Sequence, residues 1–238
     1  MSARVNAFGQ PVGPALPDWT PRPRPPRTEM RGRTCRVVPL DPEAQAAGLY
    51  ALYRAAPDAR GWTYLGDDLP ESGAAYRNRL ARMADSADPL FHAILDAGTG
   101  APLGLAAYLR IDPANGVIEV GHIHFGVPLR RSPAGTEAMA LMMARAFDEL
   151  GYRRYEWKCD SLNAPSRAAA LRYGFTFEGI FRNAVVVKGR SRDTAWFSIT
   201  DAEWPRVRAG FAAWLDPGNF DAAGRQRRGL AELRAAPA

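Results

Sequence analysis

Apolar residues recur with two different spacings along this chain of 238 residues, and the changes between them predict the order of its elements. Strict alternation with many β-branched side chains predicts strands, whereas apolar residues three and four positions apart predict helices. In the first half, these patterns predict a strand at 34–40, a helix entered at Asp41, a helix at 72–85, and strands at 90–95, 103–111 and 116–125.

The second half alternates helices with strands. A long apolar stripe follows Pro133 and ends at Gly151, and a shorter helix at 167–173 ends at Gly174; glycine often closes a helix in this way. The remaining patterns predict strands at 153–160, 180–187 and 194–199, the last two joined by a turn over 188–193, and a closing helix at 201–214.

The loop that enters the long helix has the chemistry of a phosphate site. It consists mostly of small residues and carries Arg130 and Arg131. A helix N-terminus presents unpaired N–H groups and a positive dipole end, and arginines add charge-assisted hydrogen bonds. The loop therefore predicts a pyrophosphate-binding turn, although a solvated helix start can have the same composition.

One motif contains this loop, and a second motif contains the shorter helix. They are Arg130-x-x-Pro133-x-Gly135-Thr136-Glu137-Ala138, and Asn163-x-x-Ser166 followed by Gly174-Phe175-x-x-Glu178-Gly179. In order and separation they resemble the GNAT superfamily of acyl-CoA-dependent N-acyltransferases, particularly its RimJ/RimL-like branch. The resemblance extends over about residues 34–200.

This resemblance implies an α/β (α+β) fold, with a mixed, mainly antiparallel, splayed central sheet flanked by helices. It also implies acetyl-CoA as co-substrate, held by Phe125, Val127, Arg130, Arg131, Ala134, Gly135, Thr136, Asn163 and Arg167. Phe125 and Val127 would use their backbone on the pantetheine arm. Asn163 could instead be a helix-capping residue, and Arg172 is expected to be solvated.

The sequence departs from the family pattern at two positions. Pro133 stands where the family usually has a glycine and has no N–H, so we expect a phosphate loop with fewer donors. Ala170 stands where many relatives place a tyrosine that protonates the departing thiolate. The role of general acid is therefore vacant or moved.

Amide formation from a thioester needs a group that takes the proton of the amine. Glu119 lies eleven residues before Arg130, a spacing at which some relatives place a catalytic glutamate, although a carboxylate paired with an arginine is an equal alternative. His122 and His124 are further candidates, because neutral imidazole accepts protons near pH 7. In a regular strand both point away from Glu119, and a bulge between them would bring one to its side.

Aromatic residues predict the acceptor pocket. Trp62 and Tyr64 follow the first helix, where family members close over the acceptor, and Trp157 lies on a central strand; core packing is the alternative for each. Glu156, Lys158 and Asp160 share one face of that strand. Charges on a central strand need partners, which could be neighbouring side chains or an amine substrate.

Charge and composition divide the chain into three parts. The whole net charge of +6 lies in a Pro/Arg-rich extension at 1–33 and a basic tail at 217–238, and the predicted acyltransferase domain at 34–216 is neutral. A neutral body argues against nucleic acid as a partner. No apolar run is long enough to span a membrane, and the first six residues, Met1 to Asn6, are unlike a secretory signal.

The remaining chemistry narrows the function class. Cys35 and Cys159 fit free thiols in a cytoplasmic protein, and no Cys/His spacing predicts a metal site. We therefore expect an N-acetyltransferase acting on a protein N-terminus, an amino acid or a small amine, as a monomer or homodimer. The alternative is a regulatory module that binds acyl-CoA without turnover.

Overall fold

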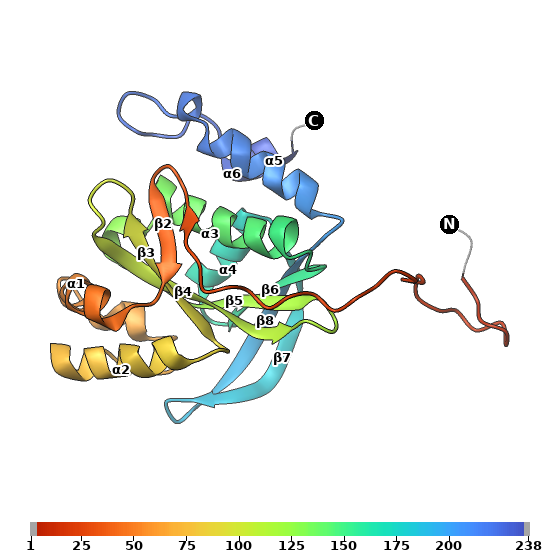
Figure 1. The fold of residues 1–238 in the computed structure, drawn as a ribbon, viewed down its shortest axis with the longest axis horizontal. Helices are drawn as coiled ribbons and strands as arrows, with labels where there is room; N and C mark the ends of the chain where they lie inside the picture. Colours follow the sequence, from red (N-terminus) through yellow and green to blue (C-terminus); the bar gives the residue numbers. More distant parts are fainter. Residues whose placement is uncertain (1–3, 236–238) are drawn as a thin grey trace.

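The computed structural model describes residues 4–235 and contains one eight-stranded sheet (Figure 1). Its strands are β1 (Met30–Arg31), β2 (Cys35–Pro39), β3 (Leu90–Asp96), β4 (Pro102–Asp112), β5 (Val117–Phe125), β6 (Arg154–Asp160), β7 (Thr176–Val187) and β8 (Arg190–Thr200). They lie in the order β1-β2-β3-β4-β5-β6-β8-β7, and only β5 and β6 pair in parallel. The expected mixed, mainly antiparallel sheet flanked by helices is confirmed.

Helices cover the two faces of the sheet unequally. One face carries α1 (Pro42–Arg54) and α2 (Gly73–Asp85), which bury their apolar stripes against the β2–β4 half. The other carries α3 (Pro133–Ala144) with a π-helical turn at Arg145–Glu149, then α4 (Ala164–Tyr173), α5 (Trp204–Leu215) and α6 (Leu230–Ala235). Short 3-10 turns lie at Ala59–Trp62, Val127–Leu129 and Pro217–Asn219.

Local sequence signals explain where these helices begin and end. The Asp41 side chain accepts hydrogen bonds from the N–H groups of Glu43 and Ala44, which caps α1 as its Asp-Pro entry predicts. Ser72 caps α2 in the same way. Gly174 ends α4 with φ 105°, a left-handed conformation that glycine adopts without strain.

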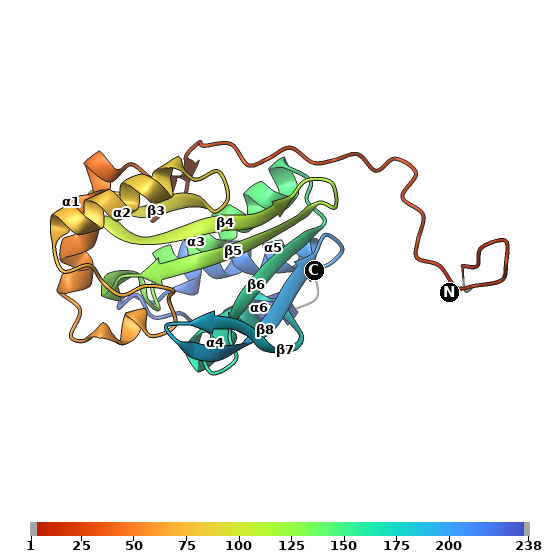
Figure 2. The same cartoon turned by 90° about the horizontal axis from the view of Figure 1, so that it is seen from below.

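β5 and β6 pair over only part of their length. Residues Val117 to Val120 face Arg154 to Trp157, and beyond that the strands diverge, as Figure 2 shows. β5 also has a bulge against β4, because two residues, His122 and Ile123, lie opposite one, and His122 has φ 48°. The central sheet is therefore splayed at the point that the family resemblance implies.

The hairpin of β7 and β8 is longer than the sequence pattern predicts. Its turn consists of Lys188 and Gly189 alone, both at positive φ, where a turn over 188–193 was expected. Two consecutive positive φ values are what a two-residue type I′ hairpin turn requires, and the twist of that turn matches the twist of the strands. The extra strand length carries the hairpin tip to the loop after α1, where Lys188 Nζ donates to Trp62 O.

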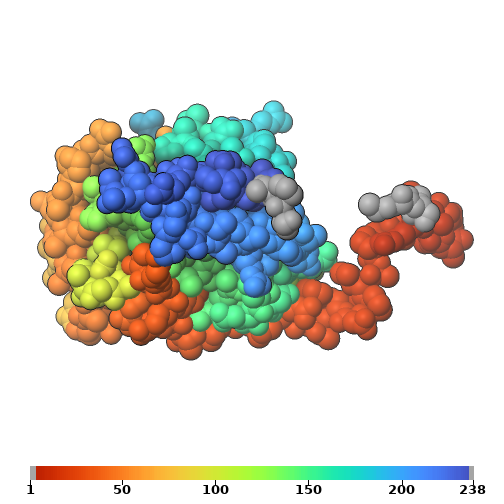
Figure 3. Space-filling model, turned by 90° about the horizontal axis from the view of Figure 1, so that it is seen from above, coloured from red at the N-terminus to blue at the C-terminus, as the bar shows by residue number. Residues whose placement is uncertain are grey.

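Both terminal segments contact the body within the described residues. Trp19 Nε1 donates to Ala114 O at 2.8 Å and its ring covers Gly116, while Phe8 is 88% exposed. β1 adds the end of the predicted 1–33 extension to the sheet, and α6 packs on α5 over the α3 face (Figure 3). Residues 1–3 and 236–238 of the two predicted terminal segments lie outside the described part of the chain.

Candidate active site

Glu119 lies next to the point where β5 and β6 part. It pairs with Glu156 in the parallel ladder, three residues before the bulge residue His122, and its side chain is only 7% exposed. Lys158 Nζ lies 2.8 Å from Glu119 Oε2 and 2.7 Å from Glu156 Oε2. Arg110 Nε lies 3.5 Å from the same Glu119 oxygen. The predicted base therefore belongs to a cluster of buried charges.

The Oε2 atom of the Glu119 carboxylate faces two cations, Lys158 and Arg110. No described residue donates a well-directed hydrogen bond to its Oε2, so the close Lys158 ammonium is an ion pair off the hydrogen-bonding direction. Burial raises the pKa of Glu119, and the charges of Lys158 and Arg110 offset part of that rise. A raised pKa brings a carboxylate closer to the range in which it exchanges protons at neutral pH.

The bulge brings His124 to the face of Glu119. Beyond the bulge His124 lies opposite Leu105, which shares a face with Ala107 and therefore with Glu119. Its ring stacks on Tyr53 at 3.9 Å and meets Trp62 edge-on at 4.3 Å. Burial, and then the charge of Arg130, lower the pKa of His124 to about 3. The lowered pKa keeps the His124 ring neutral near pH 7, and the ring packs between Tyr53 and Trp62.

His122 has a different environment from His124. It is exposed on the bulge and its ring lies 5.1 Å from that of Phe91. Desolvation by its neighbours and the charge of Arg79 lower the pKa of His122, and Asp67 opposes this effect. An exposed, neutral imidazole beside the splay can accept a proton.

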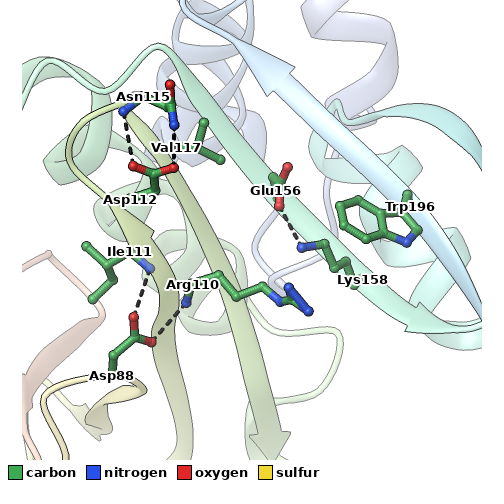
Figure 4. A pocket seen from close by; sticks show the side chains of 9 residues that line it. All are labelled: Asp88, Arg110, Ile111, Asp112, Asn115, Val117, Glu156, Lys158 and Trp196. Atoms are coloured by element: carbon green, nitrogen blue, oxygen red, sulfur yellow. Dashed lines mark hydrogen bonds and ion pairs between the residues drawn. The ribbon is translucent and has the colours of Figure 1, made fainter. Parts of the chain in front are cut away.

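A cavity of about 530 Å³ opens on this face of the sheet (Figure 4). Its lining includes Arg110, Glu156 and Lys158, which all belong to the Glu119 cluster, and the indole of Trp196. The lining is completed by Asp88, Ile111, Asp112, Asn115 and Val117. The helices α1 and α2 pack on the other half of this face, so the cavity connects the buried charges with solvent.

The entry of α3 has the form of a phosphate cradle. Ser132 caps the helix by accepting from Gly135 N, and a Cβ on Gly135 would lie 2.6 Å from Leu129 O. Among residues 4–235 the N–H groups of Arg131, Ser132 and Ala134 have no acceptor. The close approach explains the need for glycine, and the free donors suit an anion despite the missing N–H of Pro133.

Only some predicted cofactor residues lie at this cradle. Arg131, Ala134, Gly135 and Thr136 form it, and Val127 is exposed just before it. Arg130 instead donates from Nε to Phe125 O at 2.9 Å, so the Phe125 carbonyl expected to meet pantetheine already has a donor.

The predicted cofactor residues of the second motif make local contacts. Asn163 caps α4 by accepting from Ser166 N, as its alternative interpretation proposed. Arg167 donates to Ser161 O at 3.2 Å and its guanidinium lies 5.8 Å from the Phe177 ring. Both side chains are therefore committed to the β6–α4 connection in this structure.

Arg172 is not solvated as expected. It is half-buried, donates to Thr136 Oγ1 at 3.1 Å and lies 4.9 Å above the Trp214 ring. A basic side chain therefore reaches the first turns of α3 from the end of α4. No local pattern could reveal this contact, because Arg172 and Trp214 meet only when α4 and α5 pack together.

The three predicted acceptor residues lie in different surroundings, and two of them, Trp62 and Trp157, belong to the hydrophobic core. Trp62 is buried against Tyr53 and His124, and Tyr64 donates to Leu162 O, which ties the loop after α1 to the end of β6. Trp157 lies on the α3 face, where its Nε1 donates to Ser166 Oγ. Trp157 is thus a core residue, and the loop pair borders the splay.

Comparison with known proteins establishes the family. Residues 36–176, more than half of the chain, match the family described as Acetyltransferase (GNAT) domain. The chain belongs to the GNAT acetyltransferase family. A GCN5-related N-acetyltransferase from Brucella melitensis is 48% identical, with a TM-score of 0.90 over 92% of this chain and 99% of that one.

Two further structures show how far this similarity extends within the GNAT fold. A GNAT-family acetyltransferase from Chromobacterium violaceum is 39% identical, with a TM-score of 0.77 over 82% of this chain and 98% of that one. An acetyltransferase from Salmonella typhimurium, described as modifying the N-terminal serine of a 50S ribosomal subunit protein, is 17% identical, with a TM-score of 0.61 over 72% and 98%. At that identity it shares the fold. No curated protein matches the sequence.

Across residues 4–235, no three His, Cys, Asp or Glu side chains gather in a way that could hold a metal ion. Within the same residues, no helix has the length and apolar character needed to cross a bilayer.

Proposed function

We propose that this GNAT protein is an N-acetyltransferase of the RimJ/RimL-like branch, which transfers the acetyl group of acetyl-CoA to a primary amine. The observation that carries the proposal is the position of Glu119, a buried carboxylate beside the divergence of β5 and β6 whose Oε2 lies 2.8 Å from Lys158 Nζ. A cavity that opens to solvent is lined by Lys158, which contacts Glu119, and the amine would approach the cluster from this side.

The cofactor would lie across the α3 entry and along the end of β5. The free N–H groups of Arg131 and Ala134 and the charge of Arg131 suit the pyrophosphate, and Arg172 adds a second cation near Thr136. The exposed backbone at Val127 would meet the pantetheine arm. For Phe125 to do the same through its carbonyl, Arg130 has to share or release that oxygen.

The reaction assigns one proton transfer to this chain's carboxylate. The amine nitrogen attacks the thioester carbonyl carbon, its surplus proton passes to Glu119, directly or through one water, and the C–S bond breaks to release the thiolate. Ala170 is completely buried and has no proton to offer, so the thiolate is protonated from another group or from water. His122, exposed and neutral, is the second candidate for the base.

The proposed acceptor is a primary amine, which three classes of molecule carry. A protein N-terminus, an amino acid and a small amine each bring a primary amine to the cavity. The Salmonella acetyltransferase supports a protein N-terminus only through a shared fold. A test panel therefore has to include all three classes.

The test measures acetyl-CoA binding by calorimetry at pH 7.5, and free thiol release with peptides, amino acids and polyamines. We expect micromolar binding that weakens about tenfold in Arg131→Ala, since a charge-assisted contact contributes about 1.5 kcal/mol or more. Arg54→Ala, which removes an exposed arginine of α1, should bind as the wild type does. Glu119→Gln should lower kcat at least about 100-fold with unchanged cofactor affinity.

A second candidate function is favoured by Ala170. A module that binds acyl-CoA without turnover needs the α3 cradle but no acid, and the buried Ala170 offers none. Tight acetyl-CoA binding without thiol release for any amine of the panel would favour this module. Absence of acetyl-CoA binding would contradict both functions.

A further inference from the structure

We propose that Lys158 is a positioning residue for Glu119, whose ammonium fixes the carboxylate at the divergence of β5 and β6 and keeps it ionised for proton transfer. The proposal rests on the proposed function, because it gives Glu119 the role of base. It assigns Lys158 a task that no motif of the chain indicates.

The first support is the geometry of the buried triad. Lys158 Nζ lies between two carboxylates, 2.8 Å from Glu119 and 2.7 Å from Glu156, and the three side chains are only 6%, 7% and 8% exposed for Lys158, Glu119 and Glu156. Because burial penalises each charge, such a group persists only where opposite charges compensate. Removing the ammonium would leave two like charges facing each other.

The second support is that Lys158 is itself held in place. Its ammonium lies 3.7 Å from the centre of the Trp196 ring on β8. Figure 4 shows the two side chains next to each other. Glu156 is fixed from behind by Arg154 Nε at 2.7 Å, and Arg154 in turn contacts Glu178 on β7. Trp196 and Glu156 therefore leave the Lys158 side chain few alternative positions and keep its ammonium directed toward Glu119.

The charged groups around Glu119 have opposing effects on the affinity of its carboxylate for a proton. Lys158 from β6 and Arg110 from β4 favour the ionised carboxylate, and Glu156 from β6 opposes it. Arg154 and Glu178 act on it only through Glu156. Arg110 is 63% exposed and 3.5 Å away, so solvent weakens its effect, and the buried Lys158 is the main stabilising charge.

Two substitutions should therefore move the protonation of Glu119 in opposite directions. Lys158→Met removes the stabilising charge with little change in volume, and it should raise the titration midpoint of Glu119 by at least about one pH unit. Glu156→Gln removes the opposing charge and should lower that midpoint. Lys158→Arg keeps the charge and should stay near the wild type.

The experiment follows the Glu119 carboxyl by 13C NMR titration of the full chain, with Glu119→Gln to assign its signal. The acidic limb of kcat/KM against pH is measured in parallel. Lys188→Met is the matched control, because it removes the chain's other lysine, which pairs with Asp68 at the hairpin tip. It should leave the Glu119 midpoint in place.

The outcomes separate this inference from the proposed function. Opposite shifts in Lys158→Met and Glu156→Gln, with acetyl-CoA affinity within about twofold of wild type, support it; if Lys158→Met does not fold, Glu156→Gln and Lys158→Arg decide. A folded Lys158→Met protein with an unmoved Glu119 signal overturns the inference, whatever the activity. Wild-type turnover in Glu119→Gln overturns the role of Glu119 as base, while the NMR shifts still test the triad.

Discussion

The carboxylate of Glu137 on α3 fastens the start of β2 to the helix that forms the phosphate cradle. Its oxygens accept from the N–H groups of Arg33 at 2.9 Å, Thr34 at 2.6 Å and Cys35 at 3.1 Å, and from the Thr34 hydroxyl. The side chain is buried, and a Cβ on Gly32 would lie 2.5 Å from it, so no room is left for water. Replacing Glu137 tests whether its carboxylate holds the start of β2 to α3.

The expected cost follows from the groups left without a partner. An unsatisfied buried N–H costs about 1–3 kcal/mol, and such costs are not additive within one cluster. We expect Glu137→Ala to lower the free energy of unfolding by about 3–5 kcal/mol. Glu137→Gln keeps one acceptor oxygen but turns an NH2 group toward donors, so about 2 kcal/mol is expected.

The pH dependence of Glu137 gives an independent check. Although burial alone would raise it, the hydrogen bonds from Thr34 and the backbone hold the pKa of Glu137 below its ordinary value of 4.5. A carboxyl with a lowered folded pKa contributes its full stability above the unfolded value. That contribution is lost as the pH falls through the folded value. The difference between wild type and Glu137→Gln should therefore be constant above about pH 4.5 and shrink below it.

Urea unfolding followed by tryptophan fluorescence measures these differences. The control is Glu43→Gln, since Glu43 is 73% exposed in a surface pair with Arg77 and should cost less than about 0.5 kcal/mol. If Glu137→Gln unfolds within about 0.5 kcal/mol of the wild type at pH 7, the carboxylate is not the fastening group and the reasoning fails.

Two further predictions concern groups that the proposed mechanism does not use. Unfolding stability should fall as the pH drops below 6.5, because the folded state keeps His92, with a pKa of about 4, and His124, with a pKa of about 3, neutral while the unfolded chain protonates. Urea unfolding midpoints measured at pH 7 and pH 5 check this prediction. His124→Gln should reduce the difference between the two midpoints, and an unchanged difference in this variant would contradict the lowered pKa of His124. Ala170→Tyr should not restore a general acid and should cost about 1–3 kcal/mol, because Ala170 is completely buried and a phenol overpacks its site. Thermal unfolding and kcat of Ala170→Tyr test this prediction, with Ala168→Tyr on the exposed side of α4 as the control. A rise in kcat of Ala170→Tyr would show that the site accommodates the ring.

Local patterns predicted most elements, because capping and periodicity act over a few residues. Asp41 and Ser72 begin their helices where the sequence signals place them, and Gly174 ends α4. The same signals did not predict β1, since two residues become a strand only through pairing with β2. The π-helical turn after α3 and the last helix, α6, were also not predicted.

The site was predicted less completely than the fold. The family resemblance made Glu119 a candidate base, but its partner Arg110 was not predicted, because β4 and β5 bring the two together through a bulge on each strand. The family pattern placed Arg167 on the cofactor, whereas the structure turns it toward Ser161 and brings Arg172 to α3 instead. Such choices depend on packing between helices, which no short window of sequence contains.

The sequence alone determined the identity and order of the chemical groups: a small-residue turn before a helix and a carboxylate on the preceding strand. These depend on spacing along one chain, where backbone geometry fixes the distances. Only the tertiary structure decided which charges meet. The partial pairing of β5 with β6, the bulge at His122 and the placement of Lys158 between two glutamates arise from long-range strand register. That register is set by how the whole sheet buries its two faces.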